Sequence, residues 1–145
     1  KVSAEILNQL GEKCRQRGML FGWHNHDKEF APMEEGLPFD YLMTHTQPEL
    51  VRCQMDVFWV AKGNADPVTY LKKYPGRYAA LHLKDMTKDD QRTFECVGSG
   101  RLDFPGILRE ATKQGIEHFS VEQDQVEDGL ACLAQSGSYL KTLRF

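Results

Sequence analysis

The segment YAALHLKD, at residues 78–85, decides the fold that this sequence predicts. It is a short apolar run followed by polar and charged residues, which is typical of a buried strand that ends at a functional edge. Three other runs share this layout: Met19 to Trp23, Leu50 to Met55 and His118 to Val121. Together they predict four strands, near residues 20, 53, 81 and 120.

Helical patterns separate these runs. Residues 2–17 carry apolar side chains at helical spacing, among them Ile6 and Leu10, and Gly18 follows as a stop. Proline after a capping aspartate begins two more helices, one from Asp66 to about residue 74 and one from Asp103 to about residue 114. Shorter helices are predicted within residues 39–45 and 138–143. Strands that alternate with helices indicate βα units and a parallel sheet.

The number of βα units suggests a partial barrel. A complete (β/α)8 barrel has eight strands and typically about 250 residues, whereas this chain has 145 residues and four candidate strands. The chain is therefore predicted to be a single α/β domain over residues 1–145. That domain is either a small open sheet or half a barrel whose other half is absent or comes from another chain.

Composition excludes several classes of protein. The net charge of −3 argues against a nucleic-acid-binding surface. No apolar run approaches the roughly 20 residues of a membrane helix, and the first seven residues lack the layout of a signal peptide. The four cysteines form no Cys-x-x-Cys pair. We expect a cytoplasmic protein with reduced cysteines that binds neither membranes nor nucleic acids.

One histidine or carboxylate ends each predicted strand: His24, Asp56, His82 and Glu122. Because neighbouring strands lie about 4.8 Å apart, these four strand-end residues can meet around one ion. Two imidazoles and two carboxylates suit manganese, cobalt, zinc or iron. Magnesium is less favoured, because it prefers oxygen ligands and retains its waters.

A second polar residue follows two positions after three of these residues, on the same face of the strand. These residues are His26, Lys84 and Asp124, which could contact substrate or hold the ligands in place. Structural roles are the alternative for each residue taken singly: Asp56 could cap a helix, and residues 84–92 could form a solvated loop. Gly98-Ser99-Gly100 is best explained as a flexible turn before the Asp103 cap.

The same segments resemble the xylose-isomerase-like TIM-barrel superfamily of sugar (phosphate) isomerases, epimerases and inosose-dehydratase-type lyases. The matching segments are residues 22–30 (GWHNHDKEF), 54–59 (QMDVFW), 76–85 (GRYAALHLKD), 97–104 (VGSGRLDF) and 121–124 (VEQD), in the order of the superfamily.

The resemblance implies that the chain is the C-terminal half of the barrel, strands five to eight. It also implies a divalent metal at the C-terminal rim, held by Asp56, His82 and Glu122. Many relatives carry a glutamate as the first ligand. Here we favour His24, with Glu29 or His26 as the competing choice.

These observations predict a metal-dependent isomerase, epimerase or dehydratase that acts on a sugar, keto-sugar or cyclitol. The metal would act as a Lewis acid and lower the energy of an enediolate. Glu122, Glu29 and His26 are candidate bases, and Lys84 could stabilise the oxyanion. Trp59, Lys84 and Asp124 are candidate substrate contacts.

Two alternatives remain. Metal-dependent phosphodiester cleavage is known in the same superfamily, but the negative net charge weighs against it. The other alternative is a catalytically silent half-barrel that binds metal or a partner. Strands near residues 20 and 120 would be edges, and an apolar inner face would lie open. We therefore expect a homodimer or association with an N-terminal half-barrel.

Overall fold

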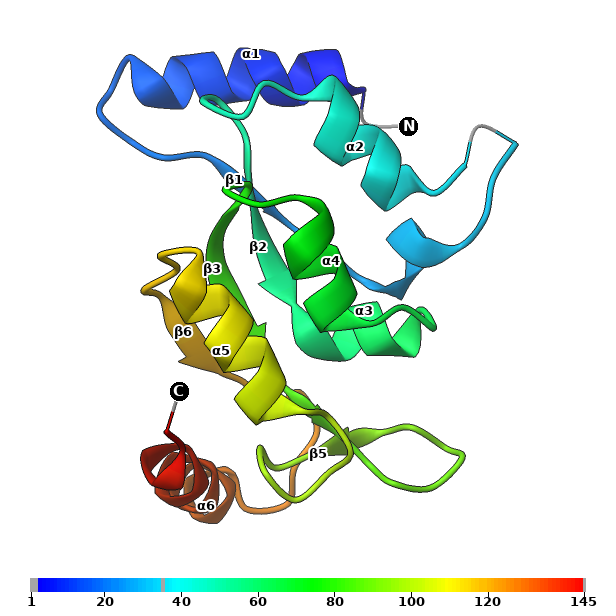
Figure 1. Cartoon of the computed structure of the whole chain (residues 1–145), viewed down its shortest axis with the longest axis vertical. Coiled ribbons are helices and arrows are strands. Elements are labelled where there is room, and N and C mark those ends of the chain that lie inside the picture. Colours follow the sequence, from blue (N-terminus) through cyan, green and yellow to red (C-terminus); the bar gives the residue numbers. More distant parts are fainter. Residues whose placement is uncertain (1–2, 35, 145) are drawn as a thin grey trace.

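The computed structural model describes residues 3–34 and 36–144, and its centre is a parallel sheet of four strands (Figure 1). The strands are β1 (Gly22–His24), β2 (Arg52–Asp56), β3 (Tyr78–Leu83) and β6 (Phe119–Val121), in the order β1-β2-β3-β6. Each neighbouring pair is parallel. The four predicted strands are confirmed, although β1 begins only at Gly22 and Leu20 before it is exposed.

The predicted helices are also present. They are α1 (Ala4–Arg15), α2 (Pro38–His45), α4 (Pro67–Lys73), α5 (Phe104–Lys113) and α6 (Gly129–Thr142). Asp66 and Asp103 cap α4 and α5 as expected, by accepting backbone N–H groups of Thr69 and Gly106. The predicted start of α1 at residue 2 lies outside the described residues. Leu7 of the predicted apolar face is buried, together with Ala4 and Gly11, whereas Ile6 and Leu10 are exposed.

Four features differ from the prediction. A 3₁₀ helix, η1 (Asp27–Phe30), and a short helix, α3 (Val57–Lys62), follow the first two strands. Helix α6 begins nine residues earlier than expected. The stretch predicted as a solvated loop, residues 84–92, includes β4 (Asp85–Met86), which forms a hairpin with β5 (Phe94–Glu95) just after it. Lys84 and Asp85 are buried, and their charged side chains bind neighbouring groups that compensate for the loss of water.

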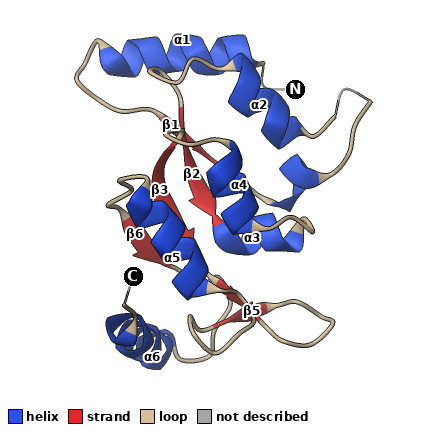
Figure 2. Ribbon diagram, viewed as in Figure 1, coloured by secondary structure: helices blue, strands red, loops and turns tan. Residues whose placement is uncertain are grey.

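The core lies between the sheet and the helices in front of it in Figure 2. Cys53 and Met55 of β2, and Leu81 and Leu83 of β3, are buried against these helices. The opposite face carries small or polar side chains that are at least partly exposed, Gln54, Ala80 and Ser120. The prediction of an apolar inner face is therefore wrong. Side chains alternate between the two faces along each strand, and the apolar ones point to the helices.

The cysteines correct another expectation. Cys96, just after β5, and Cys132, in the first turns of α6, form a disulfide, whereas Cys14 and Cys53 are free. Their Cα atoms are 5.5 Å apart although 36 residues separate them in the chain. Sequence spacing does not reveal such a contact. In the described part of the chain, no helix is long and apolar enough to cross a membrane.

Candidate metal centre

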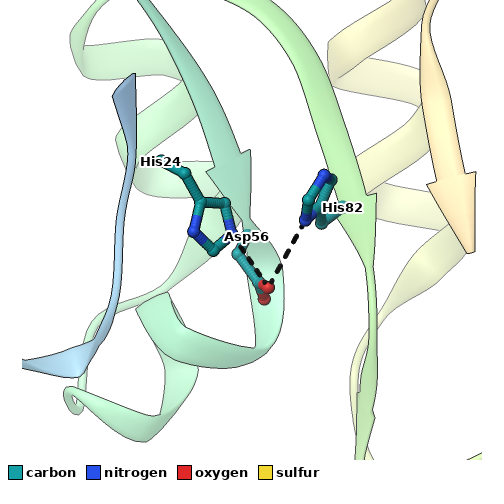
Figure 3. A group of neighbouring side chains, drawn as sticks. All are labelled: His24, Asp56 and His82. Atoms are coloured by element: carbon teal, nitrogen blue, oxygen red, sulfur yellow. Dashed lines mark hydrogen bonds and ion pairs between the residues drawn. The ribbon is translucent and has the colours of Figure 1, made fainter. Parts of the chain in front are cut away.

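The C-terminal ends of β1, β2 and β3 bring together His24, Asp56 and His82 (Figure 3). Asp56 pairs with His82 in the sheet register, and His24 pairs with Gln54, two residues before Asp56. Residues in register or two apart share a face, so all three side chains point away from the helical layer. One ligand atom from each lies within 4.8 Å of the others. This group could hold a metal ion.

Asp56 uses its two oxygens for different purposes. Oδ1 accepts the backbone N–H groups of Phe58 and Trp59 and so caps α3. Oδ2 lies 3.2 Å from His24 Nε2 and 3.0 Å from Lys84 Nζ. The capping role and the ligand role, which the sequence presented as alternatives, are compatible, because the cap fixes the rotamer that directs Oδ2 into the site.

Asn25, a residue that the sequence analysis missed, ties β1 to β2. Its side-chain Nδ2 donates to the Asp56 carbonyl at 3.2 Å, and its Oδ1 accepts the Asp56 N–H at 3.0 Å. The Asn25 side chain is fully buried. The Asn25 side chain therefore continues the hydrogen bonding between β1 and β2 beyond their last backbone pair. It thereby sets the distance between the His24 and Asp56 backbones. The only feature of the sequence that could have pointed to a role for Asn25 is its position between two histidines.

His82 offers the best test of whether a metal fits. Its Nδ1 lies 3.1 Å from Glu122 Oε2 and 3.9 Å from Asp56 Oδ2. Among the described residues this buried nitrogen has no hydrogen-bond partner of proper geometry. Burial lowers the pKa of His82, which favours the neutral ring. The lone pair of His82 Nδ1 then lies beside the carboxylates of Glu122 and Asp56. One imidazole nitrogen and two carboxylates form a donor set that suits a divalent ion.

Glu122 and Asp124 meet at Lys84. Glu122 extends the β6 pairing through its N–H to the Leu83 carbonyl. Lys84 Nζ lies 2.9 Å from Glu122 Oε2 and 3.0 Å from Asp124 Oδ1. Burial acts to lower the pKa of Lys84, but the hydrogen bonds to Glu122 and Asp124 and the Asp56 charge outweigh it and raise the pKa. The three carboxylates around Lys84 thus favour its charged form.

The remaining candidates line the rim beside β1. The His26 ring lies 4.9 Å from the His24 ring and 5.2 Å from the Trp59 ring, centroid to centroid. Glu29 is turned toward the backbone, where its Oε2 accepts the His26 N–H at 2.7 Å. Of the three candidates for the first ligand, His24 is the one that belongs to the His-Asp-His group.

A second buried carboxylate, Asp85, organises the loop at residues 96–102. Its oxygens accept backbone N–H groups from Met86, Gly98, Gly100 and Leu102. Gly100 must lack a side chain, because a Cβ there would lie 2.2 Å from the Met86 carbonyl oxygen. The predicted turn at residues 98–100 is present, and this carboxylate holds its backbone in place.

Comparison with known proteins agrees with this fold. No family model matches the chain. An inosose dehydratase of Clostridium perfringens is 26% identical in a match that covers 90% of this chain and 49% of that protein. A solved sugar phosphate isomerase/epimerase of Parabacteroides distasonis is 31% identical, with a TM-score of 0.80 over 95% of this chain and 50% of that one.

A third match shows the fold alone. A xylose isomerase domain protein of Planctomyces limnophilus is 15% identical, with a TM-score of 0.72 over 97% of this chain and 50% of that one. The chain spans about half the length of the curated relatives it matches. It therefore has the fold of half a xylose-isomerase-like TIM barrel. Its more similar relatives carry the names of sugar-modifying enzymes, a dehydratase and an isomerase/epimerase.

Proposed function

We propose that this chain carries the metal-binding half of the active site of a sugar, keto-sugar or cyclitol isomerase, epimerase or dehydratase. The observation that carries the proposal is the His24, Asp56 and His82 group, with Glu122 beside it, at the C-terminal rim of the sheet. Relatives named as an inosose dehydratase and a sugar phosphate isomerase/epimerase support the choice of chemistry.

The four strand-end residues would hold the metal, with manganese, cobalt, zinc or iron favoured over magnesium. When bound, such an ion polarises a carbonyl oxygen of the substrate. Imidazole nitrogens from His24 and His82 and carboxylate oxygens from Asp56 and Glu122 form a donor set for that purpose. His24 is preferred to Glu29, whose carboxylate is engaged with the His26 backbone.

The chain's own residues would move the proton. Glu122, with a side chain that is 38% exposed, can take a proton from the carbon next to the carbonyl. His26, against Trp59, is a second candidate for the base, while Glu29 supports the His26 backbone. The Lys84 ammonium would donate to the oxyanion that develops when this proton leaves. Asp124, beside Lys84, and Trp59, beside His26, would line the substrate pocket.

A partner would complete the pocket. Strands β1 and β6 are the edges of the described sheet, and the face that carries the strand-end residues is polar and partly exposed. Exposed edges favour pairing with further strands. We propose that a first half-barrel, from the same polypeptide or another chain, or a second copy of this chain covers this face.

Solvent exchange tests the function before the exact substrate is known. The protein is incubated in D₂O with an inosose or a ketose and with Mn²⁺ or Co²⁺, and these paramagnetic ions are removed before the spectrum is recorded because they broaden proton signals. Isomerisation, epimerisation and dehydration all begin by removing a proton next to a carbonyl, so proton NMR should show loss of that signal. Glu122→Gln should abolish the exchange while the protein retains its fold.

Two control measurements separate the possible outcomes. Chelation by EDTA and the His82→Ala substitution should both stop the exchange. Metal binding without exchange for any keto-sugar or inosose, with a first half-barrel present, would contradict the enzyme and favour the silent half-barrel. Failure of the protein to bind Mn²⁺ would contradict the metal centre itself.

A further inference from the structure

Lys84 occupies an unusual place among the proposed ligands. Its Nζ lies 3.0 Å from Asp56 Oδ2 and 2.9 Å from Glu122 Oε2. These oxygens are the ones that face His82, at 3.9 Å for Asp56 and 3.1 Å for Glu122. The ammonium therefore contacts the carboxylate oxygens that the proposed metal would need.

An ammonium and a divalent ion compete for these oxygens. Protonated lysine has no lone pair, so Lys84 cannot join the metal as a ligand. Two cations that share a pair of carboxylate oxygens would lie within a few ångströms of each other, and their repulsion is strong in a buried site. Binding of one cation therefore favours displacement of the other.

Asp124 provides Lys84 with a third carboxylate partner. Its two oxygens lie 3.0 Å and 3.1 Å from Lys84 Nζ. Asp124 does not belong to the His-Asp-His group, and its side chain is 39% exposed, whereas that of Asp56 is fully buried. The lysine can thus give up two carboxylates and keep the third.

We propose that Lys84 is an exchangeable internal cation and that Asp124 is the residue that receives it. Without metal, Lys84 neutralises Asp56 and Glu122 and holds them together. When a metal binds, Lys84 withdraws to Asp124, from where its ammonium can face the substrate. This inference rests on the proposed metal centre, and it makes Asp124 a positioning residue that acts through Lys84.

A double-mutant cycle on metal affinity tests the exchange. Mn²⁺ binding is measured by calorimetry for the wild-type protein, Asp124→Asn, Lys84→Met and the double variant. Asp124→Asn should weaken Mn²⁺ binding at least tenfold, because Lys84 loses its partner in the metal-bound state. Lys84→Met should bind Mn²⁺ at least as tightly as the wild type. The double variant should bind much as Lys84→Met does.

The cycle distinguishes exchange from simple loss of negative charge. A long-range charge effect would make Asp124→Asn equally harmful with lysine or methionine at position 84, and this additivity would overturn the exchange. Glu127→Gln removes the same charge from the same exposed segment and should leave affinity nearly unchanged. Asp124→Glu restores the carboxylate and should restore most of the affinity.

Folding and the metal centre are checked separately. Thermal melts in EDTA show whether each variant folds, and Lys84→Gln replaces Lys84→Met if the methionine variant does not. If the wild type binds Mn²⁺ and His82→Ala does not, but Asp124→Asn binds like the wild type, the exchange is wrong and the metal centre stands. If the wild type binds no Mn²⁺, both fail.

Discussion

At the residue scale, the geometry of the candidate metal centre depends on the contacts of individual atoms of Asp56. The two oxygens of Asp56 face a helix N-terminus on one side and three cationic or imidazole groups on the other. Asn25 fixes the backbone of the same residue from the neighbouring strand. A small displacement of Asp56 would therefore change the geometry around His24, His82 and Lys84 together.

Asn25→Ala should lower both stability and metal affinity. It removes two buried hydrogen bonds and leaves the Asp56 N–H and carbonyl without these partners, a cost of about 2–4 kcal/mol in the free energy of unfolding. Chemical denaturation measures the stability, and Mn²⁺ calorimetry measures the affinity.

Asn8→Ala is the matched control for Asn25. The Asn8 amide also binds backbone groups, at His45 and Gln47, but it lies on α1. We expect Asn8→Ala to lower stability without lowering metal affinity. Equal metal affinity in Asn25→Ala and the wild type would contradict the positioning role of Asn25.

At the scale of elements, Asp85 joins the β4–β5 hairpin to the loop before α5. Asp85→Ala should lower the free energy of unfolding by about 3 kcal/mol or more, because several buried N–H groups lose a charged acceptor. The exposed Asp89 also accepts backbone N–H groups, and Asp89→Ala should cost clearly less. Urea unfolding compares the two variants, and equal losses would contradict the role of Asp85.

The Cys96–Cys132 disulfide joins the same loop to α6. Its loss in Cys132→Ala should cost about 2–4 kcal/mol of stability, by relaxing a constraint on the unfolded chain. Cys14→Ala, at a free cysteine, is the control and should change stability little. Identical melting of the wild type with and without reductant would contradict this contribution. Because disulfides persist mainly in oxidising compartments, this bond argues against the predicted cytoplasmic location, which stays untested.

Elements were predictable where local signals agree. The Asp-Pro caps and the glycine after α5 predicted α4 and α5 closely. Helix α3 was missed because Val57-Phe58-Trp59-Val60 is rich in strand-forming residues, and the Asp56 cap makes it helical. The start of α6 was missed because glycine and serine weaken its helical pattern.

The site could be predicted only in part. Strand ends identified His24, Asp56, His82 and Glu122 because parallel strands finish at one edge. Asn25 and Asp85 could not be found in this way, because their partners are backbone groups that the fold brings close. Asp56 N–H, for example, is 31 residues from Asn25.

For the whole molecule, the open sheet predicts association. Edge strands β1 and β6 and the exposed apolar side chains Leu130 and Leu133 of α6 are surfaces that favour contacts with another half-barrel. We expect the purified 145-residue chain to form dimers at micromolar concentration, or to bind a first half-barrel when one is supplied. Light scattering after size exclusion measures this. A cooperative, well-folded monomer that ignores an added first half-barrel would contradict the prediction.

The disulfide also closes a covalent ring in the chain, from Cys96 to Cys132. This ring encloses α5, β6, Glu122 and Asp124. A protease that cuts one peptide bond within it leaves the two fragments linked through sulfur. The nicked protein would migrate as one species until it is reduced, and the two acidic residues beside Lys84 would stay attached to the strands that carry His24, Asp56 and His82.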